Sequence, residues 1–325
     1  METQVHKLFF ELLQVAVGQL GCLSRGPSAE EWQELYNMAR QQYLTGIGYR
    51  GVERLFDYGL RTTQDLSIDW MADAEDIKEA SAKALKRCAL VQKRLTEKGI
   101  RSSVLMGPAA GRLYDETLRE LRQPRGIDIY VSCDVKRAVR FVQLTGQQHV
   151  RHDEACVYLE KWEETPVRLY YKPGMLMGPI GDRRLKQWVR RNGDGMFQIA
   201  DGLTVPSQLM NLIYILMDIH RSLMKGSATM AQMMDCYFLL RDMDGNFGTF
   251  KDGVTMDQVL CTLDIRRFSR GVMWLLQESL QLERRLMPCE PLEPEGRFVL
   301  SEVIDGRHLL SILRQHPMDF LWSLL

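Results

Sequence analysis

The sequence predicts an α+β protein in which a small mixed β-sheet is flanked along the chain by helical regions. Three observations predict this class. Apolar side chains recur at helical spacing over residues 1–98, short β-like runs alternate with helical stretches over residues 99–180, and helical spacing returns over residues 181–325. We therefore expect an N-terminal helical region, a central α/β core and a C-terminal helical region with these boundaries.

The N-terminal region is predicted to be helical throughout. The apolar run at residues 8–13 looks like an export signal, but Glu11 and Gln14 interrupt the apolar pattern and no small-residue cleavage site follows. An amphipathic first helix fits these residues better. Helical spacing continues over residues 44–56 and 74–98, and the second of these stretches predicts a long amphipathic helix.

The central region follows the order β-α-β-α-β-β. Short apolar runs predict four strands, at residues 100–106, 127–131, 155–162 and 167–172. Helical spacing predicts two helices between them, at residues 109–121 and 135–145. The last two strands flank a polar turn near Glu164 and are expected to form a hairpin. This order describes a small mixed sheet with helices packed on it.

The C-terminal region is again predicted to be helical. Helices are expected at residues 209–224, 230–241 and 272–286, and the Pro/Glu-rich stretch 288–295 is expected to be a linker or an exposed loop. The chain has 18 methionines, several of them in the first two of these helices. Because methionine fills irregular gaps between helices, we expect these side chains to lie in the core.

Composition limits the classes of function. Lys+Arg and Asp+Glu both total 42, so no overall charge draws the chain to nucleic acid or to an anionic membrane, and nucleic-acid binding is not expected as its main activity. The seven cysteines contain no C-x-x-C pair, which argues against a disulfide framework or a zinc site and indicates a reducing compartment. No stretch reaches the ~18 apolar residues of a membrane span. We expect a cytoplasmic protein without membrane contact.

Three further sequence patterns resemble ligand-binding sites, and each also fits an ordinary structural role. Residues 181–195 carry five basic side chains around Trp188, which fits a solvated helix face or a patch that grips phosphate. Residues 242–246 begin like a calcium loop, but the required glycine and the closing glutamate are missing. His149 and His152 lie close in sequence without matching ligands around them, so we expect both at the surface.

The region from Gly107 to Asp128 resembles in outline a site for nucleotidyl transfer. Such a site needs a glycine turn before a helix to hold phosphates, two acids one residue apart on a strand, and a third acid on a neighbouring strand to complete a two-metal centre. Gly107 follows the first predicted strand, and Asp128 lies in the second. The plain structural alternative is that Gly107 only ends a strand and Asp128 is an exposed acid.

These residues resemble the uncharacterised nucleotidyltransferase family of bacterial proteins, which is related to the polymerase-β-like superfamily. The similarity rests on the short runs 104–107, 113–114, 121–122, 126–131 and 167–170, and looser similarity extends over about 30–310. The resemblance implies a bacterial cytoplasmic protein that binds a nucleoside triphosphate with Mg²⁺. It also implies that Gly107 and Arg122 are candidate nucleotide-binding residues and that Asp128 is a candidate catalytic and metal-binding residue.

The sequence departs from the family pattern at the residues that would bind metal. Where members usually read Gly-Asp-Ile-Asp, Gly126 replaces the first acid and Asp128 keeps the second. In the later Val-Glu-Leu-His segment, Arg168 replaces the third acid and Tyr170 replaces the histidine, while Met106 replaces a loop lysine. Further along, a histidine-rich stretch and an arginine of the family are replaced by residues that include Asp218, Ser222 and Ala231.

These departures predict an eroded metal site. One acid offers too few oxygens for two divalent cations, and Arg168 would repel them. We therefore expect a protein that is non-catalytic or binds nucleotide weakly, and that acts through an unidentified protein partner. The alternative is an active Mg²⁺-dependent enzyme acting on a small acceptor, with Asp128 and Glu160 as its acids. If the hairpin turn centres near Glu164, Glu160 is also expected to face Arg168 as a cross-strand pair.

Overall fold

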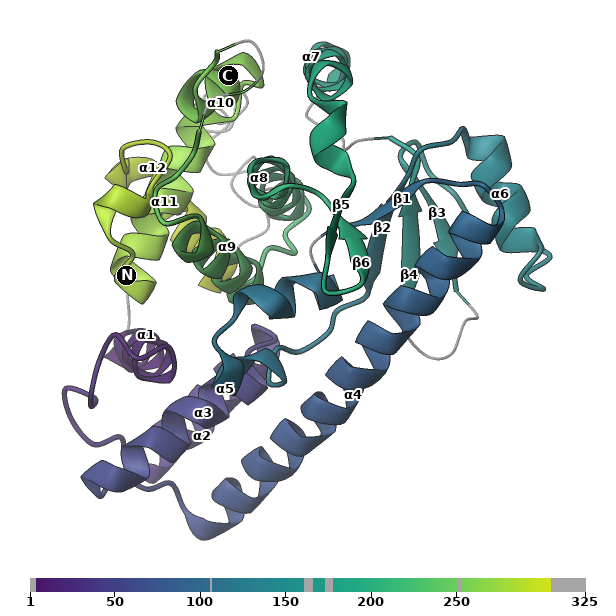
Figure 1. Ribbon diagram of the computed structural model, residues 1–325. Coiled ribbons are helices and arrows are strands. Elements are labelled where there is room, and N and C mark those ends of the chain that lie inside the picture. The colour runs from purple at the N-terminus through teal and green to yellow at the C-terminus, as the bar shows by residue number, and fades with distance from the viewer. Residues whose placement is uncertain are drawn as a thin grey trace, which may run out of the picture.

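The structure is a computed structural model that describes residues 4–105, 107–160, 166–172, 178–248, 250 and 253–304. Four helices precede the sheet: α1 (Gln4–Ala16), α2 (Ala29–Gln41), α3 (Thr45–Leu55) and α4 (Gln64–Glu97). The helices predicted at residues 44–56 and 74–98 are confirmed, although α4 begins ten residues earlier than predicted. Figure 1 shows α4 running from the other N-terminal helices to the sheet, so that one long helix joins the two parts.

The predicted first helix is present as α1, and it is buried on all sides from Leu8 onward, while Gln4 and Lys7 in its first turn are exposed. Every residue from Leu8 to Ala16 is buried, because α1 packs between α3 and a C-terminal helix, α11 (Arg266–Leu280). Glu11, which interrupts the apolar run, accepts hydrogen bonds from the backbone N–H and the hydroxyl of Ser24, both at 2.9 Å. Gln14 donates to the backbone oxygen of Ser279 at 3.1 Å. The N-terminal and C-terminal helices therefore share one core.

The four predicted strands are confirmed. The strand β2 (Ile127–Val131) has the predicted bounds, and β1 (Ser102–Val104), β3 (Cys156–Leu159) and β4 (Val167–Tyr170) are shorter than predicted. They form a mixed sheet in the order β1-β2-β4-β3, in which β2 and β4 are parallel and the other two pairings are antiparallel. The predicted helix α6 (Val135–Gln143) is also confirmed, and Asp134 caps it by accepting from the N–H of Arg137 at 2.8 Å.

The helix predicted at residues 109–121 is wrong. The chain forms a 3-10 helix, η2 (Gly107–Leu113), and a single α-helical turn, α5 (Glu116–Arg119). Gly111, within the predicted helix, is a poor residue for a continuous α-helix, because glycine loses much backbone entropy there. As a consequence, no long helix dipole points at the Gly107 turn.

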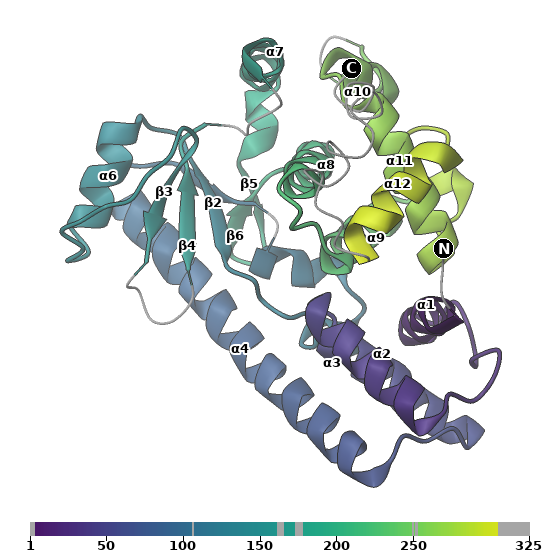
Figure 2. The same cartoon turned by 180° about the vertical axis from the view of Figure 1, so that it is seen from behind.

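The two faces of the sheet differ in polarity. Ile127, Ile129 and Val131 alternate onto one face, where they pack with Val91 of α4 and Phe141 of α6 in an apolar cluster. Asp128 and Tyr130 lie between them in the strand and therefore point to the opposite face. Figure 2 shows the sheet from behind, with α4 on one side of it and α8 on the other. The polar face is thus the one that meets the C-terminal helices.

The C-terminal region is mainly helical: α7 (Gly178–Arg191), α8 (Gln208–Met224), α9 (Met230–Met243), α10 (Met256–Thr262), α11 and α12 (Glu293–Ile304). Helices predicted at residues 209–224 and 230–241 are confirmed as α8 and α9. The third runs over Arg266–Leu280 rather than 272–286, and α12 begins inside the stretch predicted as a loop. Among the described helices, none has both the length and the apolar content needed to cross a membrane.

A hairpin that was not predicted precedes α8. Strands β5 (Gln198–Ala200) and β6 (Leu203–Val205) pair antiparallel around Asp201 and Gly202, both of which have positive φ. Asp-Gly between strands is a strong hairpin signal, because a tight turn needs left-handed residues there. The side-chain amide of Gln92 on α4 exchanges hydrogen bonds with the backbone of Thr204, at 2.8 and 3.0 Å. These hydrogen bonds hold the hairpin against the second half of α4, which also packs on the central sheet.

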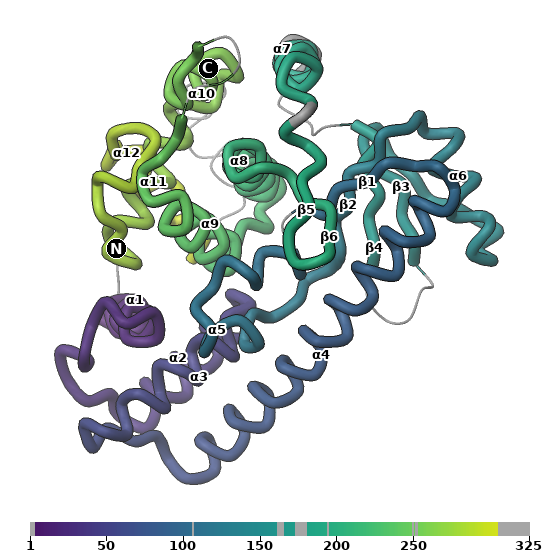
Figure 3. Tube along the Cα trace, viewed as in Figure 1, coloured from purple at the N-terminus to yellow at the C-terminus, as the bar shows by residue number. Residues whose placement is uncertain are grey.

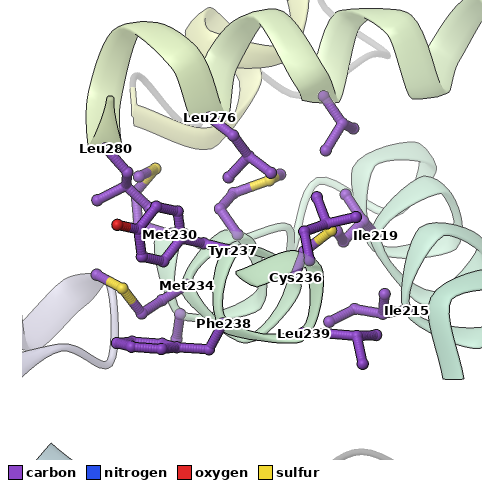
Figure 4. Packing of buried hydrophobic residues seen from close by; sticks show 14 of the residues in the cluster. Ile215, Ile219, Met230, Met234, Cys236, Tyr237, Phe238, Leu239, Leu276 and Leu280 are labelled. Carbon is purple, nitrogen blue, oxygen red and sulfur yellow. The ribbon is translucent and has the colours of Figure 1, made fainter. Parts of the chain in front are cut away.

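The largest core lies among α8, α9 and α11. Figure 4 shows side chains of α9 meeting Ile215 and Ile219 of α8 and Leu276 and Leu280 of α11. Met230, Met233 and Met234 are fully buried there, which confirms the prediction that methionines fill the core. Because α9 is buried on almost every side, its few polar side chains need partners inside the protein.

Candidate functional site

Two rows of polar side chains face each other between the sheet and α8. In the parallel pairing of β2 with β4, Asp128 is in register with Arg168 and Tyr130 with Tyr170, so all four side chains lie on the same face. On α8, Tyr214, Asp218 and Arg221 are spaced four and three residues apart and line one side of the helix. We call Asp128, Arg168, Tyr170, Asp218, Arg221 and Gln232 the sheet-face cluster.

Arg168 holds Asp128 in a bidentate ion pair. Its Nε donates to Oδ1 of Asp128 at 2.5 Å, and its Nη2 donates to Oδ2 at 2.7 Å. The side chains are partly exposed, at 37% for Arg168 and 21% for Asp128. Both oxygens of the carboxylate that survives from the family pattern are therefore engaged by the arginine that replaces the third acid.

The second acid of the cluster is engaged in the same way. Asp218 Oδ1 accepts from Nη2 of Arg221 at 2.6 Å, and Oδ2 accepts from Nε2 of Gln232 at 2.6 Å. Gln232 also donates to the hydroxyl of Ser222 at 2.9 Å, and Arg221 donates to the hydroxyl of Tyr170 at 3.1 Å. The departures at Asp218 and Ser222 thus belong to one hydrogen-bond network that reaches the sheet.

The two aspartates have pKa values displaced in opposite directions. Burial raises the pKa of Asp128, and the contact with Arg168 opposes that rise. Burial also acts to raise the pKa of Asp218, but Arg221, the hydrogen bond from Gln232, and the charges of Arg125 and Arg168 outweigh it, so the pKa is lowered. Asp218 is therefore the more strongly stabilised anion of the two.

Arginine outnumbers aspartate around this face. Arg125, just before β2, donates to the hydroxyl of Thr229 at 2.9 Å and lies near enough to lower the pKa of Asp218. Together with Arg168 and Arg221 it gives three guanidinium groups against the carboxylates of Asp128 and Asp218. The local charge is positive although the whole chain is neutral. Such a surface favours an anion over a cation.

The Gly107 turn lies beside the start of β2, as the sequence predicts. The N–H of Leu105 donates to the backbone oxygen of Asp128 at 2.9 Å. Gly107 has φ +88°, and a Cβ placed on it would lie 3.3 Å from the backbone oxygen of Gly126. Gly126 itself has φ +138°, and its Cβ would lie 3.2 Å from the backbone oxygen of Pro166. The position of the family's first acid therefore has a backbone conformation that favours glycine.

Arg122 lies in a separate polar group, which we call the clamp, formed by Tyr114, Arg122 and Asp235. Nε and Nη2 of Arg122 each donate to one oxygen of Asp235 at 2.7 Å, and the hydroxyl of Tyr114 donates to Asp235 at 2.7 Å. The side chains of Arg122 and Asp235 are only 9% and 4% exposed. This placement favours a structural role that joins the segment before β2 to α9, and nucleotide binding by Arg122 stays a prediction.

Glu160 is not the partner of Arg168. Across the β3–β4 hairpin, Arg168 is in register with Tyr158, so the predicted cross-strand pair is wrong. The observed register is shifted from the predicted one. Leu159 pairs with Val167 as the last pair of the two strands, and Glu160 lies beyond it. Glu160 instead accepts from Nε of Arg151 at 2.6 Å, with its side chain 48% exposed. A catalytic role for Glu160 stays a prediction, without support from this position.

The structure also shows the surroundings of the basic segment, the calcium-like loop and the two histidines. Trp188 of the basic segment is buried and packs edge-on against Phe250, so it is not available to stack on a ligand. Asp244, in the loop that resembles a calcium site, ends α9 with positive φ and pairs with Arg285 at 2.5 Å. His149 and His152 are exposed, as predicted.

The carboxylates of the sheet-face cluster do not fit a two-metal centre. In the part of the chain that the structure describes, no three histidine, cysteine, aspartate or glutamate side chains lie together as a possible metal site. Each oxygen of Asp128 and of Asp218 already accepts a hydrogen bond from an N–H donor. Mg²⁺ needs oxygens that are free to coordinate it, and Arg168 adds a positive charge where a metal would sit.

Comparisons with known proteins identify the family of the chain. A search among curated proteins gave no match. One solved structure, a nucleotidyltransferase-like antigenic protein from Paracoccidioides brasiliensis, is similar with 11% identity and a TM-score of 0.39, over 66% of this chain and 97% of that one. A family model described as uncharacterised nucleotidyltransferase matches residues 28–280, more than three-quarters of the chain. The chain therefore belongs to the uncharacterised nucleotidyltransferase family.

Proposed function

We propose that this protein is a member of the family whose metal site is eroded, and that it binds a phosphate-bearing nucleotide weakly and without metal instead of transferring a nucleotidyl group. The observation that carries the proposal is the bidentate pair between Arg168 and Asp128. A divalent cation at Asp128 would have to displace that guanidinium from both oxygens. The proposal therefore rests on competition between a fixed cation and a metal for the same carboxylate.

Electrostatic repulsion between the Arg168 guanidinium and a divalent cation disfavours metal binding at Asp128. At about 5 Å and an effective dielectric constant of about 20, a guanidinium and a divalent cation repel each other by ~7 kcal/mol. Solvent reduces this value, because the Arg168 side chain is 37% exposed. The remaining repulsion still acts against a metal whose possible ligands are already hydrogen-bonded.

The same arginines support binding of an anion. Guanidinium groups match phosphate oxygens in pairs, and Arg125, Arg168 and Arg221 lie around one face. The Gly107 turn lies beside the start of β2, which carries Asp128. A nucleotide held in this way would owe its affinity to arginine and would not need Mg²⁺.

Calorimetry with ATP and the other nucleoside triphosphates tests the proposal, each with Mg²⁺ and with EDTA. We expect weak binding that changes by less than about threefold on removing Mg²⁺, and no release of pyrophosphate. Arg168→Gln should weaken the binding, whereas Arg151→Gln, which removes an arginine from the same hairpin but outside the cluster, should not. Tightening by tenfold or more with Mg²⁺, together with pyrophosphate release, would refute the eroded site.

The alternative function is an active Mg²⁺-dependent enzyme. The structure offers Asp218 in place of Glu160 as its second acid. The acid whose charge acts on Asp128 is Asp218, whereas Glu160 pairs with Arg151. An active site would therefore draw on Asp128 and Asp218 after Arg168 had moved away. In that case Asp218→Asn should abolish any Mg²⁺-dependent turnover with a small acceptor, and Glu160→Gln should leave it unchanged.

A further inference from the structure

The long helix α4 separates its charges along its length. Its first half, residues 64–79, carries six acidic side chains and one lysine. Its second half, residues 80–97, carries five basic side chains and one glutamate. The sign changes at the short run of small residues from Ala80 to Ala82. A single helix of a neutral protein thus has an acidic half and a basic half.

Exposed residues of both halves lie on one face of the helix. With 3.6 residues per turn, ten exposed residues project to the same side of the helix. From the first half these are Asp65, Ile68, Asp69, Ala72, Asp76 and Glu79, and from the second half Lys83, Lys86, Leu90 and Lys93. The opposite side carries the buried residues Leu66, Trp70, Ile77 and Ala84. Two apolar side chains on the outer face are open to solvent, Ile68 at 52% and Leu90 at 37%.

The larger contacts of α4 with the described elements are with α3, β1, β6 and η2. Its first half contacts α3, and its second half contacts β1, β6 and η2. In the views of Figures 1, 2 and 3, the first half of α4 lies at a margin of the molecule, and the second half runs past the sheet toward α6. Ion pairs of α4 include those that join Asp73 to Arg40, Glu75 to Lys78 and Glu79 to Lys83. Asp65, Asp69, Lys86 and Lys93 take part in none of these pairs.

We propose that a second copy of this chain docks on this face, with the two α4 helices antiparallel across a twofold axis near Glu79. Residues at equal distance from Glu79 then face each other. Asp65 meets the partner's Lys93, fourteen residues from the axis on the other side, and Ile68 meets the partner's Leu90, eleven residues from it. Asp69 lies between the partner's Lys86 and the partner's Lys93. Every such contact occurs twice, because a twofold interface is self-complementary.

Charge complementarity is what identifies a second copy as the occupant. A partner with a surface of one sign would attract one half of α4 and repel the other half. A second α4 in the reverse direction attracts both halves at once. Because the facing residues are mainly charged, we expect modest affinity that falls with salt.

Analytical ultracentrifugation of the full chain with reversed charges tests this proposal. The acidic half is reversed by Asp65→Lys with Asp69→Lys, and the basic half by Lys86→Glu with Lys93→Glu. In each variant the facing positions 65 and 93 carry charges of the same sign, so each variant should self-associate at least tenfold more weakly than the parent chain. A one-to-one mixture of the two variants should form a heterodimer, because the positive face of one now meets the negative face of the other.

Three controls make the result decisive. Raising the salt from about 50 mM to about 500 mM should dissociate the parent dimer, because the screening length falls severalfold. Arg183→Glu with Arg190→Glu, an equal charge change on α7, should leave the dimer intact. Glu79→Cys, at the axis, should cross-link on mild oxidation, while Ala72→Cys on the same face should not. A monomeric parent chain at low salt, a dimer that neither charge variant weakens, or a mixture that fails to associate would overturn the proposal.

Discussion

The Arg122–Asp235 pair and the Arg168–Asp128 pair have the same bidentate geometry but lie in different surroundings. In the clamp, the two side chains are 9% and 4% exposed and Tyr114 adds a third hydrogen bond. In the sheet-face cluster, the two side chains are 37% and 21% exposed. The same pair of side chains therefore serves two settings: the buried clamp joins distant segments of the chain, whereas the Arg168–Asp128 pair stands where solvent can reach it.

The largest expected loss of stability comes from breaking the ion pair of the clamp. Asp235→Ala leaves the Arg122 guanidinium buried without its partner, which should lower the free energy of unfolding by about 3–5 kcal/mol. Urea denaturation followed by circular dichroism measures this change. The double variant Arg122→Met with Asp235→Leu removes both charges and should recover much of the loss. If Asp235→Ala costs less than about 1 kcal/mol, the clamp is not what joins the segment before β2 to α9.

The next effect concerns Gly126, where the family has its first acid. Gly126→Asp places a side chain at φ +138° and close to the backbone oxygen of Pro166, which should cost about 1–3 kcal/mol in the free energy of unfolding. Gly193→Asp is the matched control, since a Cβ there meets nothing within 4 Å. Equal denaturation midpoints for the two variants would mean that the backbone at Gly126 accepts an acid, and that the loss of the metal site is easily reversed.

The third effect is the gain of metal binding at the sheet face. Arg168→Glu replaces the cation beside Asp128 with an acid and should create measurable affinity for Mn²⁺ or Mg²⁺, seen as an increase in melting temperature on adding metal. Arg168→Gln removes the cation without adding an acid and should show little increase. Since the Arg168–Asp128 pair is partly exposed, its loss alone should cost only about 0.2–1 kcal/mol. No metal effect in Arg168→Glu would place the family's third acid elsewhere.

Much of the fold could be predicted from the sequence because the strands are short apolar runs between glycines and polar turns. The prediction failed at residues 109–121, where apolar spacing looks helical but Gly111 disfavours a continuous α-helix. The hairpin around Asp201 was missed within a region read as helical, although Asp-Gly there is a turn signal. Local patterns thus predict the four strands of the central sheet, but they miss the short hairpin and the irregular helices.

The site could be predicted in part. The proximity of Gly107 to the strand that carries Asp128 follows from the order of elements, because consecutive strands tend to be neighbours. The partner of Arg168 could not be predicted, since it depends on the parallel pairing of β2 with β4 and on the register of the hairpin. The clamp joins residues 113 positions apart in sequence, so only the folded chain brings Arg122 to Asp235.

The smallest effect distinguishes the two acids of the sheet-face cluster by their titration. The pKa of Asp218 is lowered in the folded state, so its charged form stabilises the fold above the ordinary carboxyl pKa of about 3.9, and that contribution is lost as the pH falls through the folded value. The pKa of Asp128 is raised, so the folded state binds its proton more tightly, and the stability it contributes falls as the pH rises through the folded value. Carboxyl carbon shifts in an NMR titration, assigned with Asp218→Asn and Asp128→Asn, should therefore show Asp218 titrating below Asp128. The reverse order would mean that Arg168 holds Asp128 more firmly than Arg221 and Gln232 hold Asp218, which would make displacement of Arg168 by a metal harder still.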